Sequence, residues 1–161
     1  MSIRPARPED LPSLVERLAR REYFADRLDR QAGHRGVLLI AWQDDLVIGD
    51  AYLWLEPAEE PEIRIHLPGT PLFTQLEIHP AHRSRGAGTR LIQASERLLA
   101  QRGYEDVALA IEVSNVETER LCRRLGFLEW PHGVVNCYSS VDDNGHRMAE
   151  ACKVLIKKLA T

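Results

Sequence analysis

The chain has 161 residues, of which 44% are hydrophobic, enough to fill one core, so we predict a single domain over residues 1–161. Its 21 basic and 24 acidic side chains give a formal net charge of −3, which excludes a surface that is basic throughout and argues against nucleic acid as a partner. Any phosphate-binding site must therefore be a local patch.

Cysteine usage and hydropathy exclude further classes of protein. Cys122, Cys137 and Cys152 are far apart and odd in number, so they predict no disulfide framework, and we expect no metal site. No apolar run approaches the roughly 18 residues that span a bilayer, and the N-terminus has no apolar signal-peptide core. We therefore expect a cytoplasmic protein that has no membrane partner.

The N-terminal half combines strand patterns with one helical segment. Apolar residues recur with helical spacing from Leu11, and the pattern continues loosely to Gly33. The segments "GVLLIAWQ" and "LVIGDAYLWL" flank a two-residue "DD" turn, which is typical of a hairpin. The strands predicted in this half are 2–7, the hairpin strands 36–43 and 46–55, a short strand at 63–66, and 72–79.

The C-terminal half begins with alternating strands and helices. An amphipathic helix is predicted over 89–102, a buried strand over 107–113 and a second helix from Ser114 to Gly126. The order strand, helix, strand, helix over 72–126 indicates parallel pairing, with the helices packed on the sheet. A further strand is predicted at 134–141, whereas apolar periodicity alone predicts a helix over 147–159.

The segment "RSRGAGTR", residues 83–90, indicates a site for phosphate. It lies between a strand and a helix, and the N-terminus of a helix presents unpaired backbone N–H groups to an anion. Gly86 and Gly88 allow close approach of the backbone, and the arginines add positive charge. Two common phosphate loops are excluded, because Thr89-Arg90 replaces the Lys-Ser/Thr pair of one and Leu91 replaces the third glycine of the other.

These residues resemble two motifs of the GNAT superfamily of N-acetyltransferases. Arg83-x-x-Gly86-x-Gly88 after "LEIHP" is similar to motif A, and "LAIEVSNVETERLCRRLGF" is similar to the next strand and motif B. The resemblance implies an α/β fold with a mixed, mostly antiparallel seven-stranded sheet, splayed central parallel strands and flanking helices. It also implies a strand at 151–159, where periodicity predicts a helix.

The resemblance further implies where acetyl-CoA binds. The loop would hold the pyrophosphate through backbone amides, and the preceding strand would hold the pantetheine arm and thioester. The Ile78 amide would polarise the thioester carbonyl, and Asn115 would contact the pantetheine. The cofactor-binding residues implied in this way are Leu76, Glu77, Ile78, Arg83, Ser84, Arg85, Gly86, Ala87, Gly88, Thr89, Asn115 and Cys122.

The catalytic groups depart from the family pattern. Many members carry a tyrosine four residues before the closing glycine of motif B, where it protonates the leaving thiolate, and Cys122 stands there instead. A thiol can donate a proton, although a small residue facing the core, with Tyr138 or a water as the acid, is the alternative. Glu77 is the first candidate for the base that accepts the proton of the amine, and Glu112 or a water relay comes next.

Two functions are compatible with these residues. The first is an N-acetyltransferase in which a primary amine attacks acetyl-CoA directly in a ternary complex, without a metal. The second is an acyl-CoA-binding sensor or partner module without turnover, motivated by Cys122 and by Gln75, which stands where relatives carry a carboxylate. The acceptor is a small-molecule amine or the amine of a peptide or protein, and the chain is expected to be a monomer or homodimer.

Overall fold

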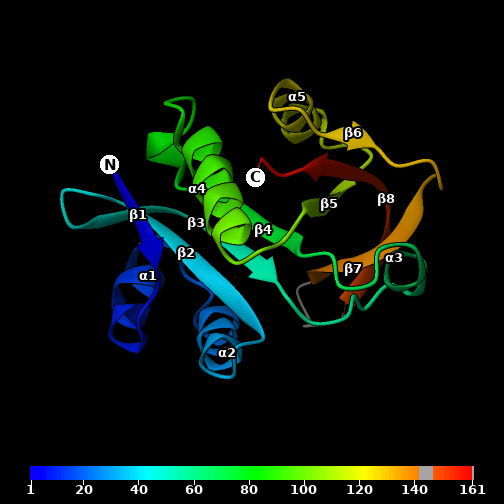
Figure 1. Cartoon of the computed structure of the whole chain (residues 1–161). Coiled ribbons are helices and arrows are strands. Elements are labelled where there is room, and N and C mark those ends of the chain that lie inside the picture. Colours follow the sequence, from blue (N-terminus) through cyan, green and yellow to red (C-terminus); the bar gives the residue numbers. More distant parts are fainter. Residues whose placement is uncertain (142–146, 161) are drawn as a thin grey trace.

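A computed structural model of the chain describes residues 1–141 and 147–160 and has one mixed sheet between layers of helices (Figure 1). The strands are β1 (Ser2–Pro5), β2 (Gly36–Gln43), β3 (Leu46–Trp54), β4 (Leu72–Ile78), β5 (Asp106–Glu112), β6 (Leu128–Glu129), β7 (Val135–Val141) and β8 (Arg147–Lys158). The helices are α1 (Leu11–Leu18), α2 (Arg21–Ala32), α3 (Pro61–His66), α4 (Ala87–Gln101) and α5 (Val116–Arg124), with the short 3₁₀ turns η1 (Pro8–Asp10) and η2 (Pro80–His82).

The sheet has the strand order β1-β2-β3-β4-β5-β8-β6, and β7 pairs with β8. Of the pairings in the described residues, only that of β4 with β5 is parallel. This confirms the predicted mixed, mostly antiparallel α/β fold. The sheet has eight strands where seven were predicted, and one of them, β6, has two residues.

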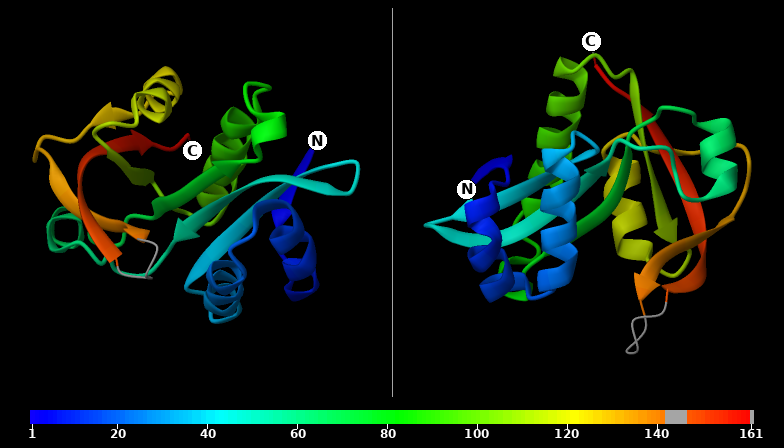
Figure 2. Two further views of the ribbon diagram at one scale, coloured as in Figure 1. Left: turned by 180° about the vertical axis from the view of Figure 1, so that it is seen from behind. Right: turned by 90° about the horizontal axis from the view of Figure 1, so that it is seen from below.

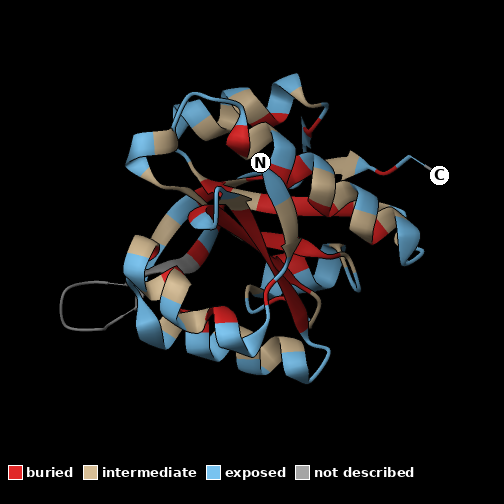
Figure 3. Cartoon of the chain, turned by 90° about the vertical axis from the view of Figure 1, so that its left-hand side faces the viewer, coloured by how far each residue is buried: buried red, intermediate tan, exposed pale blue. Residues whose placement is uncertain are grey.

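Apolar side chains cover both faces of the sheet. On one face, Leu14 of α1 and Phe24 of α2 pack against β2 and β3. On the other face, Leu91 and Leu99 of α4 pack with Cys122 of α5. The two further views show the helices on opposite sides of the sheet (Figure 2). The strands between them are largely buried, and the outer helix surfaces are exposed (Figure 3).

Residues 147–158 form strand β8. The resemblance, which implied a strand at 151–159, therefore predicted the element type correctly, and the periodicity was wrong. β8 lies inside the sheet and pairs with β5, β6 and β7.

Cys152 and Val154 enter the core on one face, while Leu155 enters the core on the other. Apolar residues thus enter the core on both faces, although Lys153 and Lys157 share the face of Leu155. The sequence therefore lacks the strict alternation by which a half-exposed strand is found.

The prediction of a short strand at 63–66 was also wrong, because these residues belong to α3. Pro61 stands in the first turn, where its fixed φ favours a helix. Ile63 is 2% exposed and Ile65 is 70% exposed, so only one of the two enters the core. A strand would have pointed both side chains to the same face.

The helical segment predicted over 11–33 is broken into α1 and α2 at Ala19 and Arg20. Both residues have left-handed φ angles, +58° and +57°. Such angles are uncommon for residues other than glycine and are often found at functional sites. The break turns the chain so that α2 begins at Arg21, beside the sheet.

Gly49 of β3 lets β3 and β4 approach closely. A Cβ atom there would lie 2.8 Å from both the Glu77 carbonyl oxygen and the Ile78 Cδ1 atom. Real Cβ atoms do not approach backbone so closely, so a larger residue must move β4.

We therefore expect the G49A variant to lose about 1–3 kcal/mol of unfolding free energy, measured by urea denaturation. G33A is the matched control, because its Cβ would meet mainly the flexible Arg35 side chain; equal losses in both variants would contradict the expectation.

Candidate functional site

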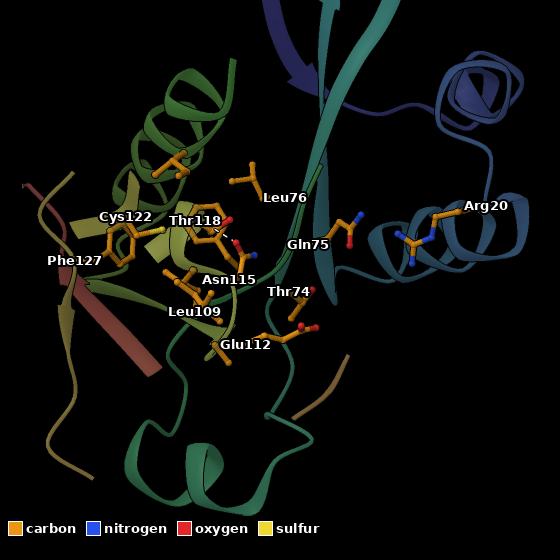
Figure 4. A pocket seen from close by; sticks show the side chains of 14 residues that line it. Arg20, Thr74, Gln75, Leu76, Leu109, Glu112, Asn115, Thr118, Cys122 and Phe127 are labelled. Atoms are coloured by element: carbon orange, nitrogen blue, oxygen red, sulfur yellow. Dashed lines mark hydrogen bonds between the residues drawn. The ribbon is translucent and has the colours of Figure 1, made fainter. Parts of the chain in front are cut away.

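A cleft opens in the sheet where β4 and β5 separate (Figure 4). Their parallel pairing covers only two residue pairs, Leu72 with Ala108 and Phe73 with Leu109. Beyond these pairs the cleft has a volume of about 620 Å³. Its lining includes Arg20, Thr74, Gln75, Leu76, Ala110, Glu112, Asn115, Thr118 and Cys122. The predicted splay of the central parallel strands is therefore present, and it forms this cleft.

Backbone groups of β4 point toward the side on which β5 is missing. The N–H of His79 donates to Ile48 of β3 at 2.8 Å. Because backbone groups alternate in direction along a strand, those of Leu76 and Ile78 point away from β3. The Ile78 carbonyl accepts a hydrogen bond from Arg83 Nε at 3.1 Å, which agrees with this direction. The splay thus leaves a strand edge on which an elongated ligand can form hydrogen bonds.

A bulge in β4 changes which side chains share a face. Tyr52 pairs with Gln75 and Leu53 pairs with Phe73, so Thr74 is the extra residue. Phe73 therefore packs with the α4 core, whereas simple alternation would place it on one face with Gln75 and Glu77. Figure 4 shows Gln75 directed toward Arg20, on the side of β4 opposite to Cys122.

Glu77 lies outside the cleft lining but is linked to it by polar contacts. Gln75 Nε2, in the lining, donates to Glu77 Oε2 at 3.0 Å. Arg20 Nη1, also in the lining, lies 3.8 Å from the same oxygen. The Glu77 side chain is 29% exposed, so it remains accessible to solvent and to a ligand. Glu77 and Arg20 thus form a charge pair at the α1–α2 side of β4.

Asp50 is a buried acid beside this pair that the sequence analysis missed. It pairs directly with Glu77 across β3 and β4 and is 0% exposed. Neither of its carboxyl oxygens has a hydrogen-bond partner among the described residues. Burial first, and then the negative charge of Glu77, raise the pKa of Asp50 well above its ordinary value, although Arg20 opposes this rise. The fold therefore favours the neutral carboxyl of Asp50 at pH values where an exposed aspartate is ionised. A sequence signal existed, because this aspartate interrupts an apolar strand.

The phosphate loop has the backbone that was expected, but it does not line the cleft. Ser84 and Gly86 have left-handed φ angles of +62° and +82°, and α4 begins at Ala87. A Cβ on Gly86 would meet nothing within 4 Å, so an anion can approach the N-terminus of α4 there. Arg85 and Arg90 line a separate hollow of about 280 Å³ beside the loop. Of the residues predicted to bind the cofactor, Leu76, Asn115 and Cys122 meet in the cleft, while Glu77, Ile78 and 83–89 lie outside its lining.

One face of α5 closes the cleft on the side of β5. Asn115 caps the helix, its Oδ1 accepting from the Thr118 N–H at 3.2 Å. Asn115, Thr118 and Cys122 follow helical spacing, so they share this face and all line the cleft. The cap uses one oxygen of Asn115 and leaves its amide NH₂ group for a ligand.

Cys122 is a protonated thiol inside the cleft wall. It is 1% exposed, and burial, followed by the nearby charge of Glu96, raises its pKa to about 11. No histidine stands among the described residues that line the cleft. The side chain of Tyr138 lies outside the described part of the chain, and Glu112 is in the lining.

The fold and the cleft define a class of acyl-transferring proteins, and comparisons with known proteins identify the family. The model of the acetyltransferase (GNAT) family matches residues 2–127, and the chain belongs to this family. No curated protein matches the chain. Within the described residues, no group of three His, Cys, Asp or Glu side chains is placed to hold a metal ion, and no helix has the length and hydropathy to cross a membrane.

Solved structures share the fold at low sequence identity. Ribosomal-protein-alanine N-acetyltransferase from Brucella melitensis has a TM-score of 0.75 at 19% identity, over 99% of this chain and 100% of that one. The acetyltransferase yncA from Salmonella typhimurium, solved with acetyl-CoA, has a TM-score of 0.72 at 18% sequence identity, over 100% of this chain and 95% of that one. The paia N-acetyltransferase from Thermoplasma acidophilum, solved with coenzyme A, has a TM-score of 0.67 at 16% sequence identity, over 98% of this chain and 99% of that one.

Asp50 makes the stability of the protein depend on pH. At about pH 3 and below, Asp50 is protonated in the folded and the unfolded chain alike, so ionisation has no effect. At higher pH the unfolded chain releases this proton while the folded chain keeps it, so Asp50 lowers stability by up to about 1.4 kcal/mol per pH unit until the pH reaches its raised pKa. We expect the D50N variant, which cannot ionise, to gain stability relative to wild type as the pH rises from 4 to 8, measured by urea unfolding.

The control for this prediction is D44N, which makes the same change of charge at an exposed position of the β2–β3 turn. Its stability relative to wild type should vary little over the same pH range. A D50N difference that stays constant from pH 4 to 8 would show that Asp50 is not held neutral by the fold.

Proposed function

We propose that this chain transfers the acetyl group of acetyl-CoA to a primary amine by direct attack in a ternary complex. The observation that carries the proposal is the cleft between β4 and β5, with the unpaired edge of β4 beside it and the open N-terminus of α4 beyond its end. The membership in the GNAT family and the acetyl-CoA and coenzyme A bound in structures of similar fold support the same donor.

The chain offers a separate group for each part of the donor. The loop 83–89 would bind the pyrophosphate through backbone N–H groups and the positive end of α4. The backbone of 76–78 and the amide of Asn115 would bind the pantetheine arm. The Ile78 N–H would stabilise negative charge on the thioester oxygen. Bound acetyl-CoA would supply the acetyl group as a thioester.

Glu77 is proposed as the base, with its carboxylate on the side of β4 that faces Arg20. The reaction joins the amine nitrogen to the acetyl carbon and breaks the bond from that carbon to the CoA sulfur. The ammonium loses two protons in all. One passes to Glu77 and then to solvent, and the other replaces the proton that the acid gives to the leaving CoA sulfur, so that the products are amide, free thiol and one released proton. A water, or Glu112 in the cleft, is the alternative to Glu77.

Cys122 is the proposed acid for the leaving sulfur, because it lies in the cleft and is protonated at neutral pH. Its raised pKa also supports a second role, that of a small neutral residue which shapes the wall. A role as acetyl carrier has no support, because a carrier would need the thiolate, and no histidine lines the cleft in the described residues.

The remaining properties belong to the same proposal. The protein acts as one domain in the cytoplasm, as a monomer or homodimer. Its acceptor is a small-molecule amine or a peptide or protein amine, and one structure of similar fold is a ribosomal-protein-alanine N-acetyltransferase. An acyl-CoA-binding sensor without turnover is the second candidate. Release of free thiol from acetyl-CoA in the presence of a panel of amines decides between them, since a sensor releases none.

Replacing the proposed base tests its role directly. We expect the E77Q variant to lower kcat/KM for the amine about 100-fold or more at neutral pH, with partial recovery at high pH, where the free amine is abundant. E62Q, at an exposed position of α3, should match the wild type. A pH profile of E77Q that runs parallel to the wild type would remove Glu77 from the reaction.

The thiol of Cys122 is tested by the C122A variant. As the acid, Cys122 should contribute about 100-fold or more to kcat, and its loss should leave the KM for acetyl-CoA nearly unchanged. C122S keeps a proton donor of similar size and should retain more activity than C122A. Equal rates for wild type and C122A would assign the acid role to another group.

A further inference from the structure

Arg20 is the positively charged side chain among the described residues that line the cleft. It lies in the break between α1 and α2, where Ala19 and Arg20 both have left-handed φ angles. Residues with side chains adopt this conformation at a cost in free energy, and no glycine is present to relieve it. The break directs the guanidinium across to β4, toward Gln75 (Figure 4).

The protein holds the Arg20 guanidinium in place but, within the described residues, leaves its hydrogen-bond donors free. Its Cζ lies 4.2 Å from the centre of the Tyr23 ring, a cation–π contact that fixes its position. It donates no hydrogen bond to a described residue, and its ion pair with Glu77 is long, at 3.8 Å. The side chain is 41% exposed. Its donors are therefore available to a ligand.

The charged side chains around Arg20 occur in pairs. Arg27, which lies over the same tyrosine ring, is paired with Asp26, and Arg20 has Glu77 as its counter-charge. Asp50 behind them is buried, which disfavours a further negative charge there. When an ammonium binds Glu77, the positive charge of Arg20 loses its partner unless the same ligand brings an anion. A diamine would bring a second positive charge toward Arg20, and a peptide N-terminus would bring no carboxylate near its amine.

We propose that Arg20 binds a carboxylate of the acceptor, so that the acceptor is an amino acid or a similar compound with an amine and a carboxylate close together. When the acceptor binds, two shorter ion pairs replace the long Arg20–Glu77 pair. The acceptor carboxylate pairs with Arg20, and the acceptor ammonium pairs with Glu77. This inference rests on the proposed function, because it places the reacting amine beside the proposed base.

The test uses sets of three acceptors that share one amine. Each of the twenty common amino acids is compared with its carboxamide and with the amine that lacks the carboxyl group, by release of free thiol from acetyl-CoA. We expect the accepted amino acids to exceed their carboxamides by about 10- to 100-fold in kcat/KM, because a hydrogen-bonded charge is lost.

Variants assign this preference to Arg20. R20Q should raise the KM for the amino acid about 10- to 100-fold with a smaller change in kcat, and it should leave the carboxamide nearly unchanged. R20K should restore part of the preference, since it keeps the charge but not the planar fork. R21Q removes the same charge at the neighbouring, exposed position and should match the wild type.

The outcomes separate this inference from the function on which it rests. Equal kcat/KM values for amino acid and carboxamide, or the same R20Q effect on both, overturn the inference and leave acetyl transfer standing. Transfer to peptide N-termini but not to free amino acids overturns it as well. Release of no thiol with any amine overturns the proposed function and this inference together.

Discussion

The short parallel pairing of β4 with β5 is the constraint on which the rest of this structure depends. Two residue pairs hold the strands together, and beyond them each strand keeps its pairing with its outer neighbour, β3 or β8. The sheet is therefore continuous at one end and open at the other. Helix α4 lies between the two strands in the chain, and η2 and the loop that follows it join the end of β4 to the N-terminus of α4. Helix α5 covers the side of β5.

β4 separates two different environments. Its unpaired edge offers backbone hydrogen bonds toward the cleft, which suits a long donor molecule. Its side chains at Gln75 and Glu77 face Arg20 and the α1–α2 break, where charges are balanced. The bulge at Thr74 aligns these side chains with that face, because one extra residue reverses the alternation. In the proposed reaction, the backbone of this one strand would bind the donor and its side chains would bind the acceptor.

The sequence allowed much of the fold and part of the site to be predicted. Glycines, helical spacing and apolar strands located the hairpin, the order from β4 to α5 and the loop with left-handed Gly86. β8 was hidden from periodicity because its apolar residues enter the core on both faces. The break at Arg20 and the bulge at Thr74 had no signal, since no glycine or proline marks them and tertiary packing determines both. Asp50 was visible as an acid in an apolar strand, but its partnerless burial needed the structure.

The two-pair contact between β4 and β5 also links ligand binding to folding. Over the rest of their length these strands lack the hydrogen bonds that join neighbours elsewhere in the sheet. A ligand held between them takes the place of the missing pairing and bridges the β1–β4 half to the β5–β8 half. Only the folded chain presents both walls, so each tenfold rise in ligand concentration above Kd adds about 1.4 kcal/mol to the unfolding free energy. A ligand that binds at the open end of the sheet would therefore hold the two halves of the sheet together as well as stabilise the folded chain.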